Sequence, residues 1–294
     1  MRLSIVISTF NAMNPLRRCL TTLEAELKRI PSLTWEIIVA DDCSDDGTAQ
    51  MLRAEFSNVR LLPAQRKGYF VQTVNRGYAA SSGDYVLHCQ SDVQVVESSV
   101  ERLLSFMDSH PDAAMCACRW LTPSTDELQP ANSHFTTLTS DLFEWTRLGW
   151  VFPRLRRSLR EFHYMQSWNR LDNRVVDVNL SNFMIFRRKA IDELRQGKPL
   201  FDNRFIIFFC EDELCWQAQK QGWKTYHLGD TFVYHIGSFS MSKLKSTFLE
   251  KATLQDREAY HRIVLGPIRS LIFRAIYRVD CIITSLLRHS HVIQ

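Results

Sequence analysis

The chain lacks several features that would assign it to a specialised class of protein. Its 8 cysteines form no Cys-x-x-Cys pair, and none is grouped with histidines at the spacing of a zinc site. Because 294 residues are enough to bury a large core without disulfides, we expect reduced cysteines and a cytosolic protein. No uncharged apolar run is as long as a membrane span, and Met1 leads directly into a strand-like segment. We therefore expect neither a spanning helix nor a signal peptide.

A large excess of charge is also missing. The formal net charge is only +4, which is too small to indicate a nucleic-acid partner. The basic residues are instead concentrated in two segments, 154–160 and 262–288. Such segments face phosphates or an anionic membrane in some proteins and are ordinary solvated helix faces in others. The sequence leaves both interpretations open.

What the sequence does contain, over its first 108 residues, is a regular alternation of short apolar strands with helices. Strands are predicted at residues 3–8, 35–40, 59–62 and 85–89, and helices at 14–30, 48–55, 70–80 and 98–108. This alternation predicts an α/β fold with a mostly parallel central sheet flanked by helices. Ligands of such sheets bind at the carboxyl ends of the strands, which is where the acidic turns of this sequence fall.

The second half of the chain is less regular. The predicted elements are a strand at 178–187, a helix at 189–195, a helix at 212–222, and extended segments at 225–228 and 231–234. Residues 121–180 contain aromatic residues and arginines with weak periodicity, which predicts no regular element in this segment. Residues 268–287 carry a helical apolar stripe flanked by arginines. This stripe predicts an amphipathic helix that either packs on its own domain or lies at a membrane surface.

Carboxylates follow two of the predicted strands. Asp41 and Asp42 follow the strand at 35–40, where they can accept hydrogen bonds from a uracil or thymine N3–H or from ribose hydroxyls. The alternative is a role in capping the next helix. Asp92 follows the strand at 85–89 and is a candidate ligand for the Mg²⁺ or Mn²⁺ that accompanies a nucleoside diphosphate. Its alternative is an ordinary turn carboxylate.

A third acidic group, residues 211–213, follows the aromatic-rich run 205–210. Desolvation by that apolar surface should raise the proton affinity of the carboxylates, which suits a general base that deprotonates a sugar hydroxyl. Acidic residues also favour helix N-termini for structural reasons, although this does not explain the aromatic neighbours. His235 follows an extended run, and its neutral imidazole suits Mn²⁺, although a lone histidine is more often structural.

These groups occur in the order found in the family 2 glycosyltransferases, which have the GT-A fold, and the chain resembles that family over residues 3–240. Its segments SIVISTFN (residues 4–11) and EIIVADDCSDDGT (residues 36–48) resemble the nucleotide-binding strands of the family. Further matching segments are 67–68, 75–80, 82–85, 183–188, 201–202, 208–215, 222–223 and 234–235. Within the family, the chain is most similar to rhamnosyltransferases and related enzymes of bacterial surface polysaccharides.

The resemblance implies a GT-A domain over residues 1–240, with a nucleotide-binding half (1–95) and an acceptor and catalytic half (96–240). Residues 241–294 would be an amphipathic helical extension. The nucleotide site would consist of Ser8, Thr9, Asn11, Asp41, Asp42, Lys67, Gly68, Asn75, Gln90, Ser91 and Asp92.

The resemblance also implies the chemistry. Asp212 would be the catalytic base, beside Glu211, and Asp92 and His235 would hold Mn²⁺ or Mg²⁺. The reaction would be an inverting transfer of a sugar from a dTDP- or UDP-sugar, such as dTDP-rhamnose, to a glycan or a polyprenyl-linked glycan. We expect it to take place in the cytoplasm, with a peripheral contact of residues 268–288 at the inner face of the cell membrane as an option.

One position departs from the family pattern. Gln90 stands where the first acid of the Asp-x-Asp motif is expected, so it brings no charge and should weaken metal binding. A non-catalytic nucleotide-sugar-binding protein is therefore one alternative. A nucleotidyltransferase is another, but residues 9–14 do not form the Gly-, Arg- or Lys-rich phosphate loop that it would need.

Overall fold

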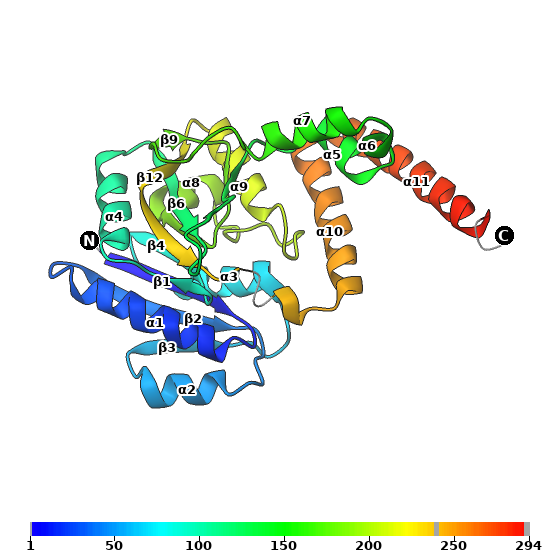
Figure 1. Ribbon diagram of the computed structural model, residues 1–294. Helices are drawn as coiled ribbons and strands as arrows, with labels where there is room; N and C mark the ends of the chain where they lie inside the picture. Colours follow the sequence, from blue (N-terminus) through cyan, green and yellow to red (C-terminus); the bar gives the residue numbers. More distant parts are fainter. Residues whose placement is uncertain (1, 238–240, 291–294) are drawn as a thin grey trace.

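The computed structural model describes residues 2–237 and 241–290 and is built around one mixed β-sheet (Figure 1). The strands follow the order β3-β2-β1-β4-β11-β6-β12-β5, with β7 beside β6 and β9 beside β12. Their bounds are β1 (Arg2–Thr9), β2 (Thr34–Asp41), β3 (Val59–Pro63), β4 (Tyr85–Gln90), β5 (Val93–Gln94), β6 (Ala113–Leu121), β7 (Leu128–Gln129), β9 (Arg174–Val175), β11 (Phe183–Arg187) and β12 (Lys224–His235). A separate short pair is formed by β8 (Asn132–Ser133) and β10 (Val178–Asn179).

The sheet is mostly parallel. β3, β2, β1 and β4 are parallel neighbours, and β12 is parallel to β6. Between these two groups, β11 is antiparallel to both β4 and β6. The α/β fold predicted from the sequence is therefore confirmed.

Helices flank the sheet and continue beyond it. The helices that belong to the alternating pattern are α1 (Met13–Lys28), α2 (Thr48–Glu55), α3 (Tyr69–Ala80), α4 (Ser99–Ser109), α8 (Arg188–Arg195) and α9 (Cys210–Lys220). A helical group off the sheet comprises α5 (Leu138–Trp145), α6 (Leu148–Val151), α7 (Pro153–His163), α10 (Ser246–Tyr260) and α11 (Pro267–Ser290). Short turns η1 (Met241–Lys243) and η2 (His261–Leu265) stand before and after α10.

The central strands are apolar because both of their faces are covered. In β1, Leu3, Ile5 and Ile7 pack in one core cluster with residues of α1, α2 and α4. The intervening Val6 packs in a second cluster with residues of α3, α8 and α9 on the other face. Successive side chains of a strand point to opposite faces, so a strand covered twice needs a continuous apolar run.

The elements that the sequence does not predict depart from the usual patterns of burial. β6 is buried at nearly every position, so its side chains do not alternate between apolar and polar. α7 carries Leu155, Leu159 and Phe162 at helical spacing, but none of its residues is buried. The single strand predicted at 178–187 is wrong: β10 pairs with β8 outside the sheet, and only β11 joins it. The segments 225–228 and 231–234 are one strand, β12, with an irregularity between Leu228 and Phe232.

The helical group off the sheet lies on one side of the molecule, where α10 connects it to the body and α11 extends away from it (Figure 1). α11 follows η2 and contacts α5. Across the residues that the structure describes, no helix combines the length and the apolar character that crossing a membrane requires.

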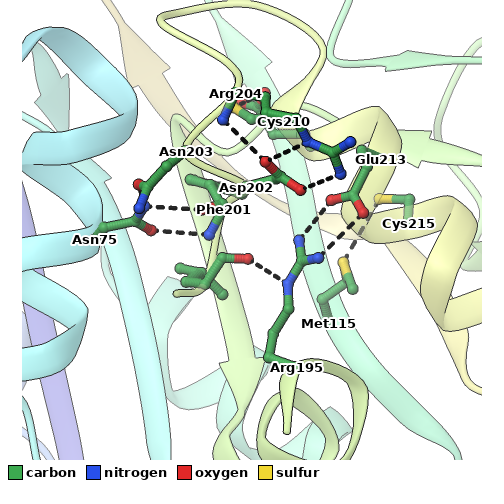
Figure 2. A network of polar contacts seen from close by, with 12 residues as sticks. Asn75, Met115, Arg195, Phe201, Asp202, Asn203, Arg204, Cys210, Glu213 and Cys215 are labelled. Atoms are coloured by element: carbon green, nitrogen blue, oxygen red, sulfur yellow. Dashed lines mark hydrogen bonds and ion pairs between the residues drawn. The ribbon is translucent and has the colours of Figure 1, made fainter. Parts of the chain in front are cut away.

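A buried ion pair fixes the first turns of α9 (Figure 2). Arg195 of α8 donates to both carboxylate oxygens of Glu213, over 3.1 and 2.6 Å, and to the Leu200 carbonyl over 2.7 Å. The side chains of Arg195 and Glu213 are only 8% and 2% exposed. Leu200 lies in the loop between α8 and α9. The next residue of this loop, Phe201, is bound through its backbone by the Asn75 amide of α3, whose oxygen and nitrogen each form a hydrogen bond of 2.8 Å.

We predict that Glu213→Gln destabilises the protein by about 3 kcal/mol, because removing one charge of a buried pair leaves the other uncompensated. The matched control is Arg204→Gln: Arg204 pairs with Asp202 but is 58% exposed, so its loss should change stability by less than about 1 kcal/mol. Urea denaturation of both variants measures the difference. Equal effects would show that burial does not set the strength of the Arg195–Glu213 pair.

Candidate active site

A cavity of about 340 Å³ lies at the carboxyl ends of β1 and β4, where ligands of parallel sheets bind. From the predicted nucleotide site it is lined by Ser8, Thr9, Asp42, Lys67, Gln90 and Ser91. From the second half of the chain it is lined by Leu180, Asn182, Ile207, Phe208, Phe209, Glu211 and His235. The fold therefore brings candidate residues of both halves to one cavity.

Asp42 organises the loop that precedes α3. Its carboxylate accepts hydrogen bonds from the backbone N–H groups of Gly68 and Tyr69, over 2.7 and 3.0 Å. Burial raises the pKa of Asp42, and these N–H groups and Lys67 partly oppose that shift. The Lys67 ammonium lies 3.1 Å from the centre of the Phe10 ring, and burial lowers the pKa of Lys67. A cation and a carboxylate thus share this wall of the cavity with an aromatic ring.

Other predicted nucleotide-site residues lie behind this wall. Asp41 accepts from the Ser44 N–H over 3.1 Å, and its second carboxylate oxygen is buried without a hydrogen-bond partner among the described residues. The Asn11 side-chain oxygen accepts from the Asp45 N–H over 2.9 Å, which ties the loop after β1 to the loop after β2. Five residues of the predicted nucleotide site are absent from the described lining of the cavity: Asn11, Asp41, Gly68, Asn75 and Asp92. The predicted base, Asp212, is absent from it as well.

His235 lines the cavity, and Asp92 lies beside it, with its Oδ1 atom 3.5 Å from His235 Nε2. The Asn182 amide lies 3.0 Å from the same Nε2, and the Gln129 side-chain oxygen lies 2.8 Å from Nδ1. In this pattern the ring donates from Nδ1 to Gln129 and its Nε2 accepts from the Asn182 amide, so a cation at Nε2 would replace that hydrogen bond. A histidine oriented in this way is a typical metal ligand.

The charge at this position is low for a metal site. Within residues 2–237 and 241–290, no three His, Cys, Asp or Glu side chains are grouped closely enough to hold a metal ion. Asp92 and His235 would therefore provide two ligands and leave other positions to a diphosphate and water. Mg²⁺ is commonly bound in that way, through one or two carboxylates together with phosphates. These two residues fit a cation that binds together with the nucleotide.

The predicted catalytic pair stands in the first turn of α9, directly after Phe209, whose φ of 61° lies in the left-handed region. Glu211 lines the cavity and accepts a hydrogen bond from the Ser181 hydroxyl over 2.7 Å. Asp212 is buried beside it, and its pKa is raised to about 7, first by desolvation and then by the negative charge of Glu211. A carboxylate with that pKa can take up a proton near neutral pH.

Asp256 of α10 is a site residue that the sequence does not predict. Its fully buried carboxylate accepts hydrogen bonds from the N–H groups of Ile206, Ile207 and Phe208, over 2.7, 2.9 and 2.8 Å. These three residues belong to the aromatic segment in front of the catalytic pair. Asp256 therefore holds in place a cavity wall that lies about fifty residues earlier in the chain. Its position on a helix with little apolar periodicity gives no sign of this role.

His88 of β4 is a second residue missed in the sequence. Its Nε2 atom lies 3.1 Å from the Ser8 hydroxyl, and its Nδ1 atom contacts the Ser181 carbonyl. Burial lowers the pKa of His88 to about 4, so the ring is neutral at physiological pH. Because Ser181 also binds Glu211, His88 links Ser8 of the predicted nucleotide site to the predicted catalytic pair.

The comparison with known families identifies the family of the chain. A family model described as "Glycosyl transferase family 2" matches residues 4–195, and the chain belongs to this family. A similar protein is the N-acetylglucosaminyl-diphospho-decaprenol L-rhamnosyltransferase of Mycobacterium tuberculosis, 23% identical over 82% of this chain and 78% of the relative. Another is the uncharacterized glycosyltransferase YibD of Escherichia coli, 29% identical over 50% of this chain. The match spans 44% of YibD, so the chain corresponds to less than half of that relative's length.

Solved structures show the same fold. TarS 1–349 from Staphylococcus aureus, in complex with UDP-GlcNAc, superposes with a TM-score of 0.53 at 15% identity, over 87% of this chain and 65% of that one. GalNAc-T7 with UDP, GalNAc and Mn²⁺ superposes with a TM-score of 0.57 at 15% identity, over 80% of this chain and 44% of that one. The predicted GT-A fold is therefore confirmed.

Proposed function

We propose that the chain is an inverting glycosyltransferase that moves a sugar from a dTDP- or UDP-sugar to a glycan or a lipid-linked glycan in surface polysaccharide synthesis. The observation that carries this proposal is the buried Asp212 carboxyl, whose pKa of about 7 suits a general base. The nucleotide would occupy the part of the first cavity that is lined by Ser8, Asp42 and Lys67. The mycobacterial relative, by its name a rhamnosyltransferase, supports dTDP-rhamnose as the donor.

In the proposed reaction, the Asp212 carboxylate takes the proton from the acceptor hydroxyl. The acceptor oxygen attacks the anomeric carbon from the side opposite the nucleotide, and the bond from that carbon to the diphosphate oxygen breaks. The configuration is inverted because there is a single displacement. Glu211, fixed by Ser181, raises the pKa of Asp212 through its charge.

A divalent cation, Mn²⁺ or Mg²⁺, would be held by Asp92 and His235 at the diphosphate. When bound, it would neutralise the charge that develops on the leaving diphosphate. The Mn²⁺ in the GalNAc-T7 structure supports a cation in this fold. Gln90 lines the cavity as a neutral amide, so most of the attraction would come from Asp92 and the diphosphate itself.

We further propose that α11 rests on the inner face of the cell membrane. Phe273 is buried, but much of the apolar stripe is exposed: Ile268, Leu271, Ile272, Val279, Ile282 and Ile283. Arg269, Arg274 and Arg278 lie on the same helix. Exposed apolar side chains with nearby arginines suit the interface of an anionic bilayer.

We predict that Asp212→Asn lowers turnover by at least about two orders of magnitude, because the amide cannot accept the proton. In the unchanged enzyme, kcat/KM should rise with pH through about 7, since a base with a raised pKa acts only when deprotonated. This rise of kcat/KM with pH should disappear in the Asp212→Asn variant, while donor binding is retained. Donor consumption is measured together with nucleotide binding.

The control for that experiment is Asp192→Asn, which removes an exposed carboxyl on α8. Full activity of Asp212→Asn would remove Asp212 from the role of base, and Glu211→Gln would be tested in its place. Nucleotide-sugar binding without any transfer or hydrolysis in the unchanged protein would instead favour the non-catalytic alternative.

EDTA should abolish activity, and Mn²⁺ or Mg²⁺ should restore it. Gln90→Asp should tighten Mn²⁺ binding, because an added ligand charge attracts a dication more strongly. Calorimetric titration with Mn²⁺ in the presence of nucleotide measures the change. Gln219→Asp adds the same charge at an exposed position of α9 and should leave Mn²⁺ affinity unchanged. Full activity in EDTA would show that Asp92 and His235 serve another purpose.

The protein should co-sediment with anionic vesicles at low salt and be released as salt rises. Each arginine near the surface contributes about 1 kcal/mol, so the triple change Arg269/Arg274/Arg278→Gln should abolish binding. A control with the same loss of charge replaces Arg53, Arg60 and Arg66, which are exposed elsewhere. If the protein does not co-sediment with anionic vesicles, or if the control variant loses as much binding as the triple variant, α11 would instead pack against a partner subunit or the core.

A further inference from the structure

A second cavity, of about 130 Å³, lies on the other side of Phe209. Phe209 lines both cavities, and the remaining walls of the second one come mainly from α5, α7 and α10. Asp212 stands three residues after Phe209 in the first turn of α9, next to Glu211 of the first cavity. A group bound in the second cavity would therefore lie across Phe209 from the first cavity, at the start of the helix that carries the proposed base.

One wall of the second cavity holds an unusual arginine. Arg257 of α10 is 4% exposed, and its guanidinium lies 3.8 Å from the centre of the Trp145 ring. Two of its nitrogens, Nε and Nη1, are buried without a hydrogen-bond partner among the described residues. The Asp141 carboxylate is 3.5 Å from Nη1, too far for a good hydrogen bond, and it already binds His261. A buried donor left in this state is costly unless a ligand takes it up.

The opposite wall adds further cations from α7. Arg156 is paired with Glu144 over 3.2 Å. Arg160 also lines the cavity, and no described carboxylate lies within ion-pair distance of it. His163 completes this wall, and burial lowers its pKa, which favours the neutral ring. The arginines thus outnumber the carboxylates Asp141 and Glu144 in the lining, and the surplus positive charge sits at Arg160.

We propose that the second cavity binds a phosphate group of the acceptor and so positions the acceptor hydroxyl at Asp212. This inference rests on the proposed glycosyl transfer, since it assigns the acceptor side of that reaction. Arginine donors approach from α7 and from α10, that is, from two directions. Such an arrangement suits the tetrahedral oxygens of a phosphate better than a planar carboxylate, which a single arginine binds edge to edge.

The phosphate could belong to a lipid carrier or to a soluble phosphate-containing polymer. Next to the cavity, α7 exposes the apolar side chains of Leu155 and Phe162, at 46% and 66%. A prenyl chain attached to the phosphate could cover these side chains. A soluble polymer would leave them in water. The length of an attached hydrocarbon chain therefore distinguishes the two sources.

The test is a calorimetric titration of the full chain, with the first cavity saturated by UDP or dTDP and Mn²⁺. Glucose 1-phosphate, its methyl diester and uncharged methyl glucoside are compared as ligands. The phosphate compounds should bind at least about tenfold more tightly than the uncharged sugar. Arg160→Gln, and Arg257→Lys if it remains folded, should remove that preference. Arg157→Gln, an exposed arginine of α7 that does not line the cavity, is the matched control.

Equal binding of charged and uncharged sugars, or no binding of any of them, would overturn the proposal. So would an equal loss in Arg160→Gln and Arg157→Gln, which would reflect the general charge of α7. Tighter binding of a geranyl diester than of the methyl diester identifies a lipid-linked phosphate, and equal binding identifies a soluble one. Failure of the unchanged protein to bind any nucleotide or consume donor would refute the proposed function itself, whereas donor consumption without a phosphate preference refutes only the second cavity.

Discussion

The site depends on how three adjacent carboxyl groups are buried in the first turn of α9. Glu211, Asp212 and Glu213 are all less than 8% exposed, and a buried charge needs compensation. Glu213 receives it from Arg195, and Glu211 receives a hydrogen bond from Ser181. No cation among the described residues pairs with Asp212, and its pKa is the one that rises to about 7. Arg195 of α8 holds Glu213, and Ser181, before β11, holds Glu211. These contacts of its two neighbours help to fix the turn that carries Asp212.

The sequence predicts the parts of this arrangement that are local. A strand buried on both faces is a continuous apolar run, and the polar residues after β1, β2 and β4 must gather at one edge of a parallel sheet. Ser8, Asp42 and Gln90 could be placed at the cavity for that reason alone. Asp256 could not, because its partners are backbone N–H groups in another segment and its own helix shows no pattern related to them. Asn75 illustrates the same limit: it falls in a motif of the family, yet its amide binds the backbone of Phe201.

The neutral side chain of Gln90 affects the net charge of the proposed cation site, and that charge affects the order in which cation and nucleotide would bind. A dication held by Asp92 and a neutral His235 keeps a net positive charge, whereas a second aspartate at position 90 would cancel it. The residual charge weakens binding of the free ion but strengthens its attraction to a diphosphate. The neutral amide would thus favour a cation that enters with the nucleotide and leaves with it. Lys67 adds a further positive charge to the same cavity, on the wall that it shares with Asp42.

The two cavities lie in different parts of the molecule, and the surfaces around them differ in the same way. The first cavity is built on the sheet, while the second cavity belongs to the helical group that includes α7 and ends in α11 (Figure 1). A nucleotide-sugar is soluble and can reach the sheet edge from water. An acceptor on a lipid carrier stays at the bilayer, and most of the large apolar side chains that are exposed among the described residues belong to the helical group. With α11 on the membrane, the second cavity would be the one nearer to the lipid, and Asp212 would stand between a donor from solution and an acceptor from the surface.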